Sequence, residues 1–230
     1  ATGKGLETGL RFSSQDGKYY ATASYYDSKS QDRITGTKIG FGGIWNNYYD
    51  ARGEARNTVL GTLAYDDTEA LHVKGYEFEI TANPTRALRV QASYGRPDSE
   101  FIDALPGQRA YFAANLAAWD AAAKLTVNPT ASTALRNALT NAQLTLDNNV
   151  AGRTRTGLVR YTSNIFANYT VAEGALRGFS IGGGAARTGR TYVSLIRNEK
   201  YYRGEQLTTS LRLGYTTKLS HIPTRLALNV

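Results

Sequence analysis

The segment that comes nearest to a recognised catalytic motif runs from Gly184 to Thr191 and reads GAARTGRT. It has the spacing of a phosphate-binding loop, except that Arg190 stands where that motif has lysine. Such a loop binds phosphate when a helix begins at its end, because the first backbone N–H groups of the helix point at the anion. The residues that follow, 192–196, read YVSLI, a run typical of a strand. Since glycine in a strand usually marks a bend or close packing, the sequence favours a strand here over a nucleotide site.

Histidine and glutamate, the usual residues of acid–base catalysis, do not form a recognisable site in this sequence either. The two histidines are His72, which we expect at the start of a strand, and His221, which we expect in a tight turn at the opposite end of the fold. Glu77 and Glu79 lie one pleat repeat apart on one strand face, but such pairs are common on any solvated face. We therefore expect no enzyme activity.

Composition narrows the possible partners and ligands. Asp66-Asp67 and Asp147 lack the spacing of a calcium loop, and no cysteine is present for thiol chemistry, so we expect no cofactor and no metal site. The net charge is +8, yet the basic residues are spread along the chain without the stripe of a nucleic-acid binder, and we expect no nucleic acid as partner. No run of about 18 apolar residues exists, which excludes a transmembrane helix. The 16 tyrosines suit a membrane interface, although tyrosine is also a good strand former.

The side chains discussed above are carried by stretches of roughly ten residues in which apolar and polar residues alternate. This alternation predicts strands with two different faces. Short joints connect them at Asp16-Gly17, Asn83-Pro84, 173–178 and 221–223. Longer joints cover about 30–70, 99–155 and 194–204. Tight turns at one edge of a sheet and long loops at the other are the layout of an outer-membrane β-barrel.

The two faces of the predicted strands differ in chemistry. In a soluble sandwich the charged face is outside and the apolar face meets another sheet, whereas in a membrane barrel the apolar face meets lipid and the charged face lines a wet lumen. Several strands run roughly ten to fifteen residues, longer than the five or six usual in soluble sheets, and about ten suffice to cross a bilayer at a tilt of about 40°. We therefore interpret the pattern as a membrane barrel. The residues expected to face lipid are Tyr76, Phe78, Ile80, Leu88, Val90, Leu211, Leu213, Leu226 and Leu228. The residues expected to face the lumen, as candidates for substrate contact, are Glu77, Glu79, Arg89, Arg160, Arg212 and Arg225.

The long joints have patterns of their own. Residues 104–123 are rich in alanine with aromatic residues at helical spacing, and residues 133–146 carry leucines at helical spacing. Asn128-Pro129 separates the two runs. The pattern predicts two short helices in a loop at about 104–150, either as a cap on the outside or as ordinary packing helices. The joint 35–69, rich in glycine, asparagine and aromatic residues, predicts irregular extensions of the strands.

Three motifs, taken in order, resemble a known family. Gly75-Tyr76-Glu77-Phe78-Glu79 followed by Asn83-Pro84-Thr85 resembles the GxExE…NP hairpin in the C-terminal barrel of TonB-dependent outer-membrane transporters. Residues 6–12, LETGLRF, resemble the earlier ExGxK/R strand of these barrels, and residues 226–230, LALNV, resemble the start of their LxLNVxNLFD segment. The resemblance covers nearly the whole chain and rests on the order and spacing of the motifs.

The resemblance implies an all-β fold, in which residues 1–230 belong to a single antiparallel up-and-down transmembrane β-barrel domain. About eight strands of a 22-stranded barrel lie in this chain, with a helical extracellular loop at about 104–150. In this family a plug domain inside the barrel binds TonB and moves to admit scarce, large substrates such as chelated iron, a vitamin or a glycan. The chain lacks an initiator methionine and a leader and stops within a strand pattern, so we expect an internal piece with the plug outside it.

The expected function is therefore that of part of a TonB-dependent transporter in the cell outer membrane of a Gram-negative bacterium, with a siderophore among the expected substrates. Its expected partners are membrane lipid, TonB through the plug, and a transported small molecule or glycan. One alternative is a complete small barrel of eight strands that acts as an adhesin, porin or structural anchor, which should end in an aromatic residue. Another is an outer-membrane enzyme, which needs a catalytic group at the barrel rim. The resemblance assigns no residue to substrate binding.

Overall fold

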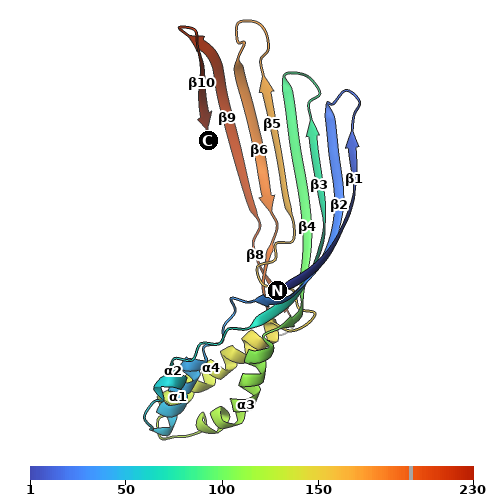
Figure 1. The fold of residues 1–230 in the computed structure, drawn as a ribbon. Helices are drawn as coiled ribbons and strands as arrows, with labels where there is room; N and C mark the ends of the chain where they lie inside the picture. Colours follow the sequence, from blue (N-terminus) through green and yellow to red (C-terminus); the bar gives the residue numbers. More distant parts are fainter. Residues whose placement is uncertain (197–198) are drawn as a thin grey trace. The chain divides into compact units, whose positions relative to one another are not determined.

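The computed structural model describes residues 1–196 and 199–230, so two residues of the joint 194–204 lie outside the described part (Figure 1). The chain divides into two compact units, which are described separately below. Unit 1 comprises residues 1–4, 29–72 and 100–155, and unit 2 comprises residues 5–28, 73–99 and 156–230.

Eight strands form one sheet in the order β1-β2-β3-β4-β5-β6-β9-β10 (Figure 1). Their bounds are β1 Thr2–Ser13, β2 Tyr19–Ile34, β3 Thr68–Ala82, β4 Leu88–Ala104, β5 Thr162–Thr170, β6 Phe179–Thr188, β9 Gln206–Leu219 and β10 Ile222–Asn229. A second, two-stranded sheet consists of β7, Thr191–Ile196, and β8, Glu199–Arg203. In the large sheet every strand lies beside its neighbour in sequence, except that β6 is followed by β9. The predicted antiparallel meander is confirmed, with an additional hairpin inserted between β6 and β9.

The tight connections lie close to the predicted positions. Gly17 (φ +67°) turns β1 into β2, and Gly174 and Gly178 (φ +78° and +88°) lie in the joint between β5 and β6. Ser220 and His221, with φ of 48° and 71°, form a two-residue turn between β9 and β10, as expected for a hairpin turn that needs positive φ at both central residues. This last turn begins one residue earlier than predicted, because residues 222 and 223 already pair with β9. Since consecutive strands alternate in direction, the tight turns share one end of the sheet.

Unit 1 is built around helices. Their bounds are α1 Phe41–Arg52, α2 Thr58–Gly61, α3 Pro106–Ala122 and α4 Pro129–Asn148. The two predicted helices are α3 and α4. The Asn128-Pro129 pair begins α4: Pro129 occupies its first turn, and the Asn128 side chain accepts a hydrogen bond of 3.2 Å from the N–H of Ala131. None of the described helices combines the length and the apolarity needed to cross a bilayer.

The prediction of irregular strand extensions over 35–69 is wrong, because this joint contains α1 and α2. Glycines and asparagines make FGGIWNNYYDAR a poor helix by intrinsic propensity. Phe41 and Ile44, however, are fully or nearly fully buried on one side of α1, and burial of this apolar side stabilises the helix. Gly53, in the left-handed conformation, ends it.

Trp119 of α3 is the centre of the aromatic core of unit 1. Its side chain is fully buried. Its ring centroid lies 5.3 Å from Trp45, 5.8 Å from Phe112 and 6.1 Å from Phe41. The indole N–H of Trp45 donates a hydrogen bond of 2.9 Å to the hydroxyl of Tyr111. These contacts join α1 to α3.

A buried polar cluster holds the beginning of α3. Leu105, at the N-cap position, has a φ of 57° and offers no side-chain acceptor to the free N–H groups of the first turn. The Asp67 carboxylate is the acceptor instead: it accepts a hydrogen bond of 2.7 Å from the backbone N–H of Gln108. The Gln108 amide oxygen accepts from the N–H of Ile39 at 2.7 Å, and its amide nitrogen donates to the carbonyl of Thr37 at 3.0 Å. The cluster therefore joins the joint before α1 to the N-terminus of α3.

Substituting Asp67→Ala should destabilise the first turn of α3 by about 1–2 kcal/mol, because the buried N–H of Gln108 loses its acceptor. Hydrogen–deuterium exchange on the full-length protein should show faster exchange in peptides that begin at residue 106. Asp120→Ala removes an exposed carboxylate from the same helix and serves as the control. Equal exchange in both variants would contradict the capping role of Asp67.

Candidate functional site: the two faces of the sheet

The strand registers define which side chains share a face. One row across β4, β5, β6, β9 and β10 consists of Arg89, Asn168, Gly182, Arg212 and Asn229. The adjacent row consists of Leu88, Tyr169, Ile181, Leu213 and Leu228. Because neighbouring residues of a strand point to opposite faces, the first row belongs to a polar face and the second to an apolar face.

The apolar face is large and uncovered by the described residues. Leu226 is 61% exposed and Leu228 58%, and Ile80 of β3 is 52% exposed. Isolated exposed apolar side chains are ordinary on soluble proteins, but a face that continues from β3 to β10 far exceeds a usual surface patch. This face therefore needs an apolar environment that the described chain does not supply.

Aromatic side chains border the apolar face at two levels. At the level away from the tight turns, Tyr94 stacks on Tyr161 with a centroid distance of 6.1 Å, and Tyr76 lies 5.1 Å from Tyr25. At the level near the tight turns lie Phe179, Tyr215 and Tyr169. Residues eight apart in sequence, such as 161 and 169, span about 26 Å of extended chain, or about 20 Å across a layer at a tilt of about 40°. That spacing is close to the apolar band of an outer-membrane barrel, which is about 25 Å tall and flanked by aromatic girdles.

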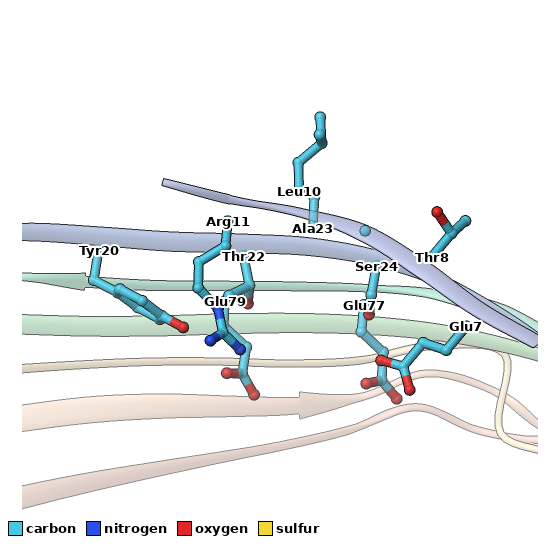
Figure 2. Close-up of a pocket in the computed structure, with 11 residues that line it drawn as sticks. Glu7, Thr8, Leu10, Arg11, Tyr20, Thr22, Ala23, Ser24, Glu77 and Glu79 are labelled. Atoms are coloured by element: carbon cyan, nitrogen blue, oxygen red, sulfur yellow. The ribbon is translucent and has the colours of Figure 1, made fainter. Parts of the chain in front are cut away.

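The polar face is acidic over β1 to β3. A groove of about 710 Å³ there is lined by the carboxylates of Glu7, Glu77 and Glu79 together with the side chains of Arg11 and Tyr20. In Figure 2 these side chains point to the same side of the sheet, and Leu10 points to the other. The Arg11 guanidinium carbon lies 5.8 Å from the centre of the Tyr20 ring.

Gly75, the first residue of the GxExE pattern, is required by close packing on this same face. A Cβ atom at this position would lie 2.5 Å from the hydroxyl oxygen of Tyr26 and 2.7 Å from the carbonyl oxygen of Arg96. The glycine therefore lets the Tyr26 side chain lie against β3 beside the two glutamates.

The polar face is basic over β4 to β10. The registers place Arg89, Arg212, Lys218 and Arg225 on it, and the residues that they pair in these strands include no carboxylate. Between β4 and β9, Gly182 and Gly184 of β6 carry no side chain. A Cβ atom at Gly182 would lie 2.8 Å from the Asn168 amide oxygen, because the side chains of β5 lean over this part of β6. The polar face thus has an acidic part and a basic part.

Five of the six predicted site residues lie on this polar face. Glu77 and Glu79 belong to the acidic part, and Arg89, Arg212 and Arg225 belong to the basic part. The assignment of this face to a lumen stays a prediction. Glu7 and Arg11 belong to the same surface. Their alternation in the sequence already placed both on the polar face of one strand, but it did not show that they share a groove with Glu77 and Glu79.

Arg160 is the exception, and its expected place within a strand starting at Val159 is wrong. β5 begins at Thr162, because residues 157–160 pair with residues 190–192 instead. Tyr192 donates a backbone hydrogen bond of 2.8 Å to Leu158, and Arg160 donates one of 3.0 Å to Arg190. Alternation in the sequence could not reveal this change of partner, because the pattern continues unbroken through residue 160.

The other residues that the sequence analysis considered lie on separate elements of the described chain. The nucleotide-loop resemblance over 184–191 falls on the end of β6 and the start of β7, so the predicted strand is confirmed there. His221 lies in the turn after β9, and His72 lies within β3, 3.4 Å from Glu100. The described residues contain no group of three side chains that could hold a metal ion.

An open antiparallel meander with one apolar and one charged face has the layout of part of the wall of an outer-membrane β-barrel. Solved structures of outer-membrane receptors and transporters are similar to this chain over nearly its whole length. BauA, the ferric preacinetobactin receptor from Acinetobacter baumannii, is similar over 99% of this chain and 24% of its own, with a TM-score of 0.55 and 11% identity. The pyoverdine outer membrane receptor FpvA from Pseudomonas aeruginosa is similar over 93% and 23%, with a TM-score of 0.52 and 16% identity. The FrpB iron transporter from Neisseria meningitidis is similar over 93% and 24%, with a TM-score of 0.52 and 10% identity.

These similarities concern the fold, since the identities are low and the chain spans about a quarter of the length of each receptor. No protein-family profile and no curated protein sequence matches the chain. The fold expected from the three sequence motifs, an antiparallel sheet of about eight strands like part of the wall of such a barrel, is confirmed.

Proposed function

We propose that this chain forms part of the barrel wall of a TonB-dependent receptor that imports an iron chelate across the cell outer membrane. The observation that carries the proposal is the pair of faces: an uncovered apolar face between two levels of aromatic residues, and a charged face behind it. In water this apolar face is unstable, whereas in a bilayer it meets lipid and every strand hydrogen bond stays within the sheet.

In this proposal the apolar face contacts lipid and the polar face lines the lumen, with Glu77, Glu79, Arg89, Arg212 and Arg225 accessible from inside. Residues 1–230 belong to one barrel domain, and α3 and α4 belong to an extracellular loop. TonB acts through a plug domain encoded elsewhere in the polypeptide. The similar structures support iron chelates as the substrate class, because their names describe a ferric preacinetobactin receptor, a pyoverdine receptor and an iron transporter.

The proposed activity is transport rather than catalysis. The polar face offers carboxylates, guanidinium groups and hydroxyls, which bind and guide a polar cargo, and neither histidine of the chain lines the groove. Charged side chains around a water-filled lumen attract solutes of opposite charge.

Uptake of radiolabelled ferric chelates by iron-starved cells tests the proposal. Cells that carry the full-length protein should accumulate iron from at least one chelate, cells that lack it should not, and removal of TonB should abolish the difference. The protein should fractionate with the outer membrane and migrate faster on gels before boiling than after. Uptake that persists without TonB, or a protein found outside the outer membrane, contradicts the proposal.

A further inference from the structure

The hairpin inserted between β6 and β9 is part of a small three-segment platform. Residues 156–161, β7 and β8 lie side by side; we call them the β7–β8 platform. Val159 forms a bridge with Thr191, and Thr191 pairs in turn with Arg203. Tyr192 pairs with Tyr202 in the same hairpin. Backbone pairing on both sides of β7 gives the platform a defined shape.

On the platform, an arginine side chain lies over a tyrosine ring. Tyr192 is nearly fully buried and lies edge-on to Tyr202, with a centroid distance of 5.8 Å. The Arg160 guanidinium carbon lies 5.8 Å from the centre of the Tyr202 ring, a cation–π arrangement. The hydrogen bond between the backbones of Arg160 and Arg190 holds these two arginines next to each other.

The described part of the platform and its flanks has an excess of positive charge. Its cationic side chains are Arg160, Arg190, Lys200 and Arg203, and its carboxylates are Glu199 and Glu205. Glu205 is engaged by Arg187, whose Nε donates to it at 3.1 Å, and this hydrogen bond lowers the pKa of the Glu205 carboxyl. Within residues 1–196 and 199–230, the salt bridges include none of the four platform cations, although the charge of Arg190 also helps to lower the pKa of the Glu205 carboxyl.

We propose that the β7–β8 platform recognises the negative charge of the incoming substrate, so that the receptor takes an anionic iron chelate in preference to a neutral one. The inference rests on the proposed transport function and specifies its substrate class. A guanidinium group donates two parallel N–H hydrogen bonds to a carboxylate or to neighbouring phenolate oxygens, the groups that give such chelates their charge. The tyrosine rings offer flat apolar surface against which the aromatic rings of a catecholate chelate can pack.

Equilibrium binding to the full-length protein in a non-ionic detergent tests this inference. The probes are the triply anionic ferric complex of a tris-catecholate and the neutral ferric complex of a trihydroxamate, with quenching of protein fluorescence as the signal. The wild-type protein should bind the anionic probe more tightly. The double variant Arg160→Gln/Arg190→Gln should lose roughly tenfold or more in affinity for the anionic probe and keep its affinity for the neutral one, because charged hydrogen bonds are lost.

The matched control is Arg86→Gln/Arg177→Gln, which removes the same charge from exposed arginines in the tight turns. It should bind both probes as the wild type does. Arg160→Lys keeps the charge without the planar fork and should fall between wild type and the double variant. Heat-modifiable migration establishes that each variant is folded before binding is measured.

The salt dependence of wild-type binding gives a second measurement that needs no variant. Affinity for the anionic probe should fall as ionic strength rises, and affinity for the neutral probe should not. Equal loss for both probes in the double variant, equal wild-type affinity for the two probes, or binding of neither overturns the inference. These outcomes leave the proposed function intact when TonB-dependent iron uptake persists in cells, and loss of that uptake contradicts the proposed function itself.

Discussion

Substituting Trp119→Ala is expected to destabilise the helical core of unit 1 by about 3–5 kcal/mol. The ring is fully buried and touches aromatic rings of both α1 and α3, so its removal leaves a cavity that small shifts of the helices cannot fill. Hydrogen–deuterium exchange of the full-length protein should show much faster exchange over residues 41–52 and 106–148. Strands β5, β6 and β9 should keep their protection, because every ring contact of Trp119 lies within unit 1.

The matched control is Leu144→Ala on α4, where the side chain is 44% exposed and loses little on truncation. Its exchange should stay near that of the wild type. Unchanged protection of α1 in the Trp119→Ala variant would show that the aromatic core does not hold this helix.

Substituting Leu211→Arg is expected to cost about 2–4 kcal/mol of stability in a bilayer. Leu211 lies in the row of Val90, Ala167 and Gly183 on the apolar face. On β9 it is midway between Leu207, in the row of Tyr94, and Tyr215, at the level near the tight turns. An arginine there enters the middle of the apolar band, where its charge is most costly. Urea unfolding of the full-length protein in phosphatidylcholine vesicles, followed by heat-modifiable migration, measures the loss.

Ser210→Arg introduces the same side chain one residue earlier, on the polar face in the row of Gly184. It should change the unfolding free energy by less than about 1 kcal/mol, since the lumen side is wet. The reverse order of the two effects would exchange the lipid-facing and lumen-facing assignments.

The sheet could be predicted from the sequence because strand alternation and turn residues, the two patterns that indicate it, are both local. The alternation of Tyr76, Phe78 and Ile80 with Glu77 and Glu79 defines a two-faced strand without reference to any neighbour. Likewise, Gly17 marks a turn through its own backbone preference. Helix α4 was predictable for the same reason, since the adjacent residues Asn128 and Pro129 are an N-cap residue and a first-turn proline, a common start of a helix.

The errors arose where distant residues decide the local structure. α1 contains glycines and asparagines, so its propensity argued against a helix, and the packing of Phe41, Ile44 and Trp45 against the rest of unit 1 stabilises it. The spacing of Phe41, Ile44, Trp45 and Tyr48 was nevertheless helical and could have indicated it. Arg160 was misplaced because a strand pattern does not identify the neighbour with which the strand pairs.

The sequence predicted which side of each strand is polar, but it did not predict how the charged residues of several strands are distributed across the sheet. Alternation identified Glu77 and Arg89 as members of one side of the sheet. The separation of acidic residues on β1 to β3 from basic residues on β4 to β10 depends on strand order, which no single segment encodes. The groove beside Glu7 likewise depends on three strands meeting.

This separation of charge gives the polar face an electric field directed across its width, from the strands that carry Arg89 and Arg212 toward those that carry Glu77 and Glu79. A dipolar molecule beside such a face experiences a torque, which turns its negative end toward β9 and its positive end toward β3. The torque acts before any contact forms and needs no net charge on the molecule. On the proposed lumenal wall, cargo is therefore aligned by the arrangement of its charges, and two isomers of equal charge and size pass this surface in different orientations.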